Sequence, residues 1–119
     1  MKSTKDYSDY LSDIIQYARK AENFLEGVSL EAFKANEEKA LAVIRALEVI
    51  GEAARSIPKQ IRNKYPQVPW NEMTGMRDKL IHDYFGVNLM VVWRTVKEDL
   101  PPMTSAVEKM IQDLKAANK

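Results

Sequence analysis

The single histidine of the chain, His82, is the side chain with the most versatile chemistry in the sequence. Imidazole changes its charge near neutral pH, so it can accept or donate a proton as a general base or acid. Arg77 stands five positions earlier and supplies a permanent charge with forked N–H donors that suit phosphate oxygens. Together these two side chains suffice for a metal-free transphosphorylation of RNA.

The spacing of this pair leaves a purely structural alternative open. His82 could pair with Asp83 at a helix end, and Arg77 could form a surface ion pair with Asp78. On an ideal helix the two candidate residues also point about 140° apart, at about 100° per residue. We therefore expect either that the helix frays near His82 or that two copies, related by a twofold axis, build a composite site.

A basic stretch surrounds the candidate pair. Between Arg55 and Lys97 there are eight basic and three acidic residues, although the net charge of the whole chain is only +1. Such an asymmetry is typical of a polyanion-binding face, while the alternative is a solvated surface whose charges cancel in three dimensions. The residues expected to contact RNA phosphates are Lys59, Arg62, Lys64 and Lys79.

Composition excludes several other classes of protein. The chain has no cysteine, which rules out disulfides, thiolate zinc sites and cysteine nucleophiles, and no convincing metal cluster or cofactor motif stands out. No export signal or long apolar run is seen, so we expect a cytoplasmic protein that makes no membrane contact. Its 119 residues suit a single domain over positions 1–119.

Apolar residues recur at helical spacing nearly throughout the chain. We expect helices over about 7–25, 37–57, 71–84 and 89–96, and a last helix after Pro101 and Pro102, which should break the chain. Ser29, Asn36 and Asn88 suit helix starts. The valine-rich segment before Pro101 could also form a strand, but it has no second strand to pair with. The prediction is an all-α bundle of four or five helices.

Gly51 lies inside the second long helix of this prediction, where glycine is about 1 kcal/mol less favourable than alanine. With Ala53 and Ala54 it offers a surface without bulky side chains. We expect this surface to allow a close approach of another helix, including one from a second copy of the chain.

The segment around the candidate pair also resembles a known signature. Residues 75–87, Gly-Met-Arg-Asp-Lys-Leu-Ile-His-Asp-Tyr-Phe-Gly-Val, are similar to the Arg-x4-His-x-Tyr motif of the HepT family of HEPN toxins. Segments 48–54, 65–70 and 92–101 also match the habits of this family, so the resemblance covers essentially the whole chain.

This resemblance implies a HEPN-like fold and a homodimeric endoribonuclease with Arg77 and His82 as its catalytic residues and Asp78 orienting the arginine. It also implies a type VII-like toxin–antitoxin pair with a minimal nucleotidyltransferase antitoxin, MntA, which would transfer AMP from ATP to Tyr84. The alternative is a non-catalytic dimerisation module that binds a nucleotide or a partner protein.

Overall fold

The structure is a computed structural model that describes residues 6–82 and 86–117. Within these ranges the ordered elements are helical and no strand is found, which confirms the all-α prediction. The elements are α1 (Tyr7–Phe24), α2 (Leu30–Lys34), α3 (Glu37–Ser56), α4 (Lys59–Asn63), α5 (Trp70–His82), α6 (Leu89–Arg94), a π-helical turn (Thr95–Asp99) and α7 (Leu100–Ala117).

Side-chain caps fix the starts of several of these helices. Ser29 accepts a hydrogen bond from the Ala32 N–H at α2, and Asn36 accepts one from the Lys39 N–H at α3. Asn88 accepts from two backbone N–H groups at the start of α6. Each cap satisfies donors that the first helical turn leaves without a partner. All three caps follow the sequence prediction.

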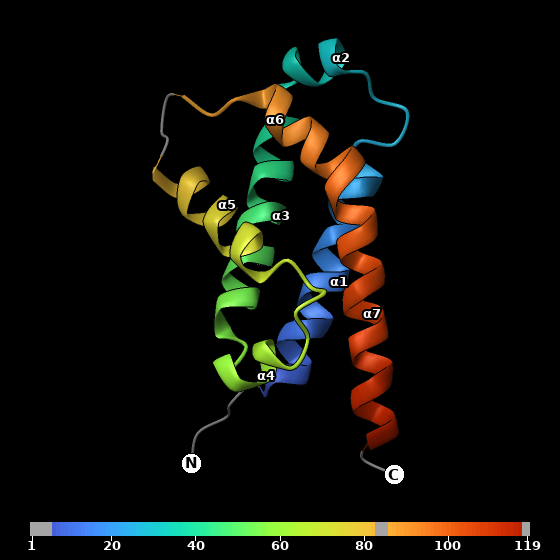
Figure 1. Ribbon diagram of the computed structural model, residues 1–119. Helices are drawn as coiled ribbons and strands as arrows, with labels where there is room; N and C mark the ends of the chain where they lie inside the picture. Colours follow the sequence, from blue (N-terminus) through green and yellow to red (C-terminus); the bar gives the residue numbers. More distant parts are fainter. Residues whose placement is uncertain (1–5, 83–85, 118–119) are drawn as a thin grey trace, which may run out of the picture.

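The long helices lie side by side, with α3 between α1 and α5, and with α7 on the other side of α1 (Figure 1). α1 and α3 run in opposite directions, and α5 crosses the outer side of α3 (Figure 1). The short helix α4 turns the chain between α3 and α5.

The core consists mainly of aliphatic side chains from α1, α3 and α7, including the fully enclosed Leu11, Val43 and Val107. Burial of these apolar surfaces is the main stabilising contribution to such a bundle. Leu41 on α3 is an exception among the leucines of this helix, because it is 62% exposed. In the described part of the chain, no helix is long and apolar enough to cross a membrane.

The prediction that Pro101 and Pro102 break the chain before the last helix is wrong. Both residues lie in the first turn of α7, which follows directly on the π-helical turn. There the Leu100 N–H donates to the Thr95 carbonyl, five residues earlier. The wider turn and the position at a helix start make the missing proline N–H groups harmless.

Between the predicted helices over 37–57 and 71–84, where no helix was expected, the chain forms α4 over Lys59–Asn63. The predicted helix over 71–84 corresponds to α5, which begins at Trp70. Its expected last residues fall in 83–85, outside the described residues, and these include Tyr84.

Candidate active site

Both candidate catalytic residues lie on α5, and this helix remains continuous up to His82, its last residue. No fraying is therefore seen in α5 up to His82, and the next residues, 83–85, lie outside the described residues. Arg77 is partly buried, with 27% of its side chain exposed, whereas His82 is exposed. Because the helix is intact, the angle between these two positions stays at about 140°. One copy of α5 thus presents the two groups in different directions.

Arg77 lies against α3 at the position of Gly51. A Cβ atom built on Gly51 would collide with the Arg77 Cβ and would lie 2.8 Å from the Met73 carbonyl oxygen and 2.9 Å from the Arg77 Cγ. Only a glycine allows the two helices to approach this closely. The predicted close approach at Gly51 is confirmed. It occurs within one chain, and Gly51, Ala53 and Ala54 are buried there, so this surface is not free for a second copy.

Asp78 links Arg77 to a further basic residue, Arg55 at the end of α3. The Arg77 Nη1 donates to Asp78 Oδ1 at 3.1 Å. The Arg55 Nη2 reaches both carboxylate oxygens, at 2.7 and 2.6 Å. Hydrogen bonds from Arg55, and then from Arg77, lower the pKa of Asp78, because they favour its charged form.

Sequence reasoning identified the Arg77–Asp78 contact but missed Arg55. In the sequence, the only indication of a role for Arg55 was its place at the start of the basic stretch. Its 23-residue separation from Asp78 is bridged by the packing of α3 on α5, which no local pattern reports. The Arg77 Nε atom is buried and has no hydrogen-bond partner among the described residues. The guanidinium is thus held on one side by Asp78 and retains donor capacity.

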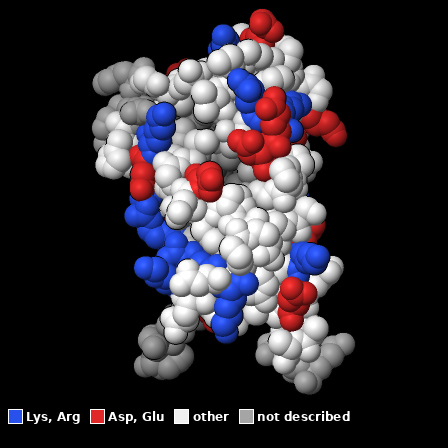
Figure 2. Space-filling model, viewed as in Figure 1, with Lys and Arg blue, Asp and Glu red and all other residues white. Residues whose placement is uncertain are grey.

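The four lysines and arginines expected to contact RNA do not converge on one point. Lys59 and Arg62 line a cavity of about 690 Å³ between α4 and the start of α5. Lys79 lines a different cavity, of about 280 Å³, formed with the segment that leads into α6. Lys64 is exposed at the end of α4. Figure 2 shows Lys and Arg side chains as a band along the side of the molecule that carries α5 and α4.

Comparison with known proteins gives the family of the chain. The sequence model of the HepT-like family, described as "Ribonuclease HepT-like", matches residues 14–110 of this chain. A "Probable ribonuclease HepT" of Thermococcus cleftensis is 45% identical over 106 residues, which are 89% of this chain and 96% of that protein. The chain belongs to the HepT-like ribonuclease family.

Two proteins of Methanocaldococcus jannaschii that carry RNase in their names are similarly related. One is 44% identical over 115 residues, covering 97% of this chain and 95% of its own length. The other is 48% identical over 110 residues, covering 92% and 95%. No solved structure matches the chain significantly.

Proposed function

We propose that this protein is a metal-independent endoribonuclease in which Arg77 and His82 act on the RNA phosphodiester. The observation that carries the proposal is the fixed position of Arg77 within a chain of the ribonuclease family. Because Gly51 has no side chain, the aliphatic part of Arg77 packs against α3, and Asp78 accepts a hydrogen bond from one nitrogen of the Arg77 guanidinium. A charged fork held in this way suits the growing negative charge of a transition-state phosphate.

In the proposed reaction, His82 removes the proton from a ribose 2′-hydroxyl, and the 2′-oxygen attacks the adjacent phosphorus. The bond from phosphorus to the 5′-oxygen breaks, this leaving oxygen takes up a proton from water, and His82 returns the proton it accepted to the solvent. The products are a 2′,3′-cyclic phosphate and a 5′-hydroxyl end. Arg77 stabilises the charge that accumulates on the non-bridging oxygens.

Purified protein is expected to cleave single-stranded RNA into fragments with cyclic phosphate ends, at a rate that EDTA leaves unchanged. The reason is that the Arg77–His82 chemistry needs no Lewis acid. Mass spectrometry of the fragments identifies the ends, and cleavage is followed on a labelled oligonucleotide. Cleavage that stops with EDTA and returns with a divalent ion would contradict the mechanism. RNA binding without any cleavage would favour the non-catalytic module.

The divergence of Arg77 and His82 on α5 supports a homodimer in which both copies of the helix line one cleft. A twofold axis brings the same element of two subunits face to face, so the arginine of one copy can meet the histidine of the other. Large apolar side chains on α3 and α6 remain exposed in the single chain, namely Leu41, Met90 and Val91. A second copy that covered them would remove apolar surface from water.

We further propose that the protein is the toxin of a toxin–antitoxin pair and that an MntA-type nucleotidyltransferase inactivates it. Transfer of AMP from ATP to the Tyr84 hydroxyl, with release of pyrophosphate, would place an anionic phosphate two residues from His82 in the chain. Arg77 could pair with this phosphate, so the modification would block RNA by its volume and by occupying the arginine.

Co-expression with the cognate nucleotidyltransferase is expected to add one or more AMP units at Tyr84 and to abolish cleavage. Intact-mass spectrometry and peptide mapping measure the modification. The variant Tyr84→Phe should stay unmodified and should keep most of its cleavage, since no proton transfer is assigned to the phenol. An added mass that persists in this variant, or no added mass in the wild type, would refute this account of inhibition.

A further inference from the structure

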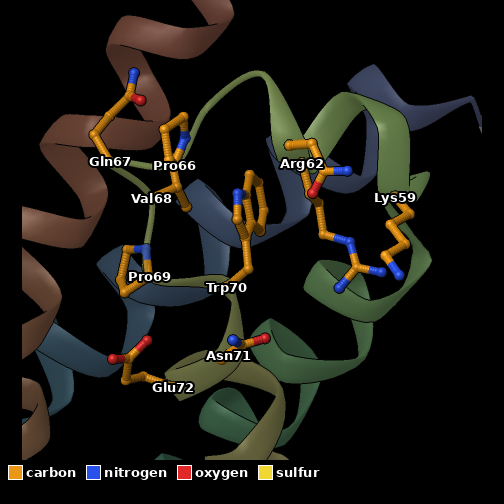
Figure 3. A pocket seen from close by; sticks show the side chains of 10 residues that line it. Lys59, Arg62, Pro66, Gln67, Val68, Pro69, Trp70, Asn71 and Glu72 are labelled. Atoms are coloured by element: carbon orange, nitrogen blue, oxygen red, sulfur yellow. The ribbon is translucent and has the colours of Figure 1, made fainter.

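The cavity between α4 and α5 is lined by different kinds of side chain at its two ends and in its middle. The chain passes from α4 through the segment 64–69 to the start of α5, and the cavity lies within this turn. Figure 3 shows Lys59 and Arg62 at one end, the Trp70 ring in the middle, and Gln67 and Glu72 toward the other end. The cavity therefore has a cationic end, an apolar wall and a polar end.

Among the described residues, the two cations of this cavity have no protein counter-ion. Neither Lys59 nor Arg62 forms an ion pair with any residue that the structure describes. In addition, the Arg62 Nε atom is buried and lacks a hydrogen-bond partner among those residues. An unsatisfied buried donor is unfavourable because it has lost its hydrogen bond to water without gaining another. A bound anion at this end would satisfy the donor and neutralise both charges.

The wall beside the cationic end suits a planar apolar group. Trp70 is only 7% exposed, and its Nε1 donates to the Tyr65 carbonyl at 3.0 Å, which fixes the indole in place. Pro66 and Pro69 add further apolar surface to the lining. A nucleobase can be held against such a wall only if it has left a base stack, which restricts the ligand to single-stranded nucleic acid.

The far end of the cavity argues against a simple anion as the ligand. Glu72 lines it, and a carboxylate repels a second negative charge. It can instead accept hydrogen bonds from base amino groups, while the Asn71 amide can donate and accept. A ligand with a phosphate at one end and a base at the other fits this division better than free phosphate.

The start of α5 connects this cavity to the candidate active site. Asn71 and Glu72 line the cavity, and Arg77 follows five to six residues later on the same helix, about 8–9 Å along its axis. A phosphate at Lys59 and Arg62 is therefore separate from the one that Arg77 would hold. We propose that the cavity is a subsite for one nucleotide of single-stranded RNA next to the cleaved one, an inference that rests on the proposed ribonuclease function. Its phosphate lies at Lys59 and Arg62, and its base lies against Trp70.

The first test separates binding from chemistry. The double variant Lys59→Gln/Arg62→Gln should raise KM for a short RNA about tenfold, since charge-assisted contacts are lost, with little change in kcat. The slope of log affinity against log salt should also become shallower by about 0.7 for each phosphate contact removed. The matched control is Lys109→Gln/Lys115→Gln, which removes the same charge from exposed positions on α7. An unchanged KM, or an equal effect of the control, would overturn the proposal.

The second test does not depend on cleavage. The chain has two tryptophans, and each gives an indole N–H signal in a nitrogen–proton NMR spectrum. Titration with cytidine 5′-monophosphate should shift the Trp70 signal, whereas the Trp93 signal, whose N–H donates to the Val28 carbonyl, should stay in place. Inorganic phosphate should bind more weakly, and the double variant should show no saturable shift.

These two tests distinguish failure of the subsite from failure of the ribonuclease function. Wild-type protein that binds the nucleotide at Trp70 but cleaves no RNA would keep the subsite and reject the catalytic proposal. Cleavage with no nucleotide-dependent shift of the Trp70 signal, and with KM unchanged in the double variant, would do the reverse. Equal shifts in the wild type and the double variant would also overturn the assignment of the phosphate to Lys59 and Arg62.

Discussion

Replacing His82 by alanine is expected to lower the rate of RNA cleavage by about 10²–10⁴-fold, the usual contribution of a general acid or base. No other histidine in the sequence could take over the proton transfer. The loss should appear in kcat, measured on a labelled oligonucleotide under saturating conditions. The fold should be unaffected, because the side chain is exposed at the end of α5. Thermal unfolding of the variant provides the control.

If the active site is shared between two subunits, the His82→Ala variant also allows a complementation test. Co-expression of His82→Ala with Arg77→Ala, each carrying a different tag, should yield heterodimers that cleave RNA much faster than either parent. If each site takes its arginine from one subunit and its histidine from the other, the heterodimer contains one complete site. Inactive heterodimers, or a wild-type protein that is active as a monomer in sedimentation, would contradict this arrangement.

The substitution Gly51→Ala is expected to have the second large effect, on both stability and catalysis. The added methyl group would collide with the Cβ of Arg77 and would lie close to the Met73 carbonyl oxygen. Overpacking of this kind lowers the free energy of unfolding by about 1–3 kcal/mol. Displacement of the arginine by about 1 Å can also reduce the rate about 10²-fold. Denaturant unfolding and kcat/KM for RNA cleavage measure the two effects.

A matched control for this substitution lies on α5 itself. Gly75 is exposed, and a Cβ atom built on it would meet nothing within 4 Å, so Gly75→Ala should preserve activity and slightly stabilise the helix. If Gly51 acts through Arg77, Gly51→Ala should reduce activity little further in an Arg77→Ala background. Wild-type activity in Gly51→Ala would show that the close approach of α3 and α5 does not position the arginine.

Local features of the sequence were sufficient to predict the helices. The caps at Ser29, Asn36 and Asn88 act within one helical turn, and the apolar spacing reports one helix at a time. The same reasoning placed Arg77 on one helix with His82 and expected its contact with Asp78. It was wrong at Pro101 and Pro102, because a π-helical turn before them removed the conflict that proline normally creates.

Only the tertiary structure decided what surrounds these residues. The contact of Gly51 with Arg77 and the reach of Arg55 to Asp78 both depend on how α3 packs on α5. The cavity with Lys59 and Arg62 depends on how the segment 64–69 turns the chain back from α4. Helix formation depends on residues three or four positions apart in the sequence, whereas these contacts join residues that are far apart in the sequence and lie on different helices. Their geometry is set by the burial of apolar faces, which fixes each helix against its neighbours.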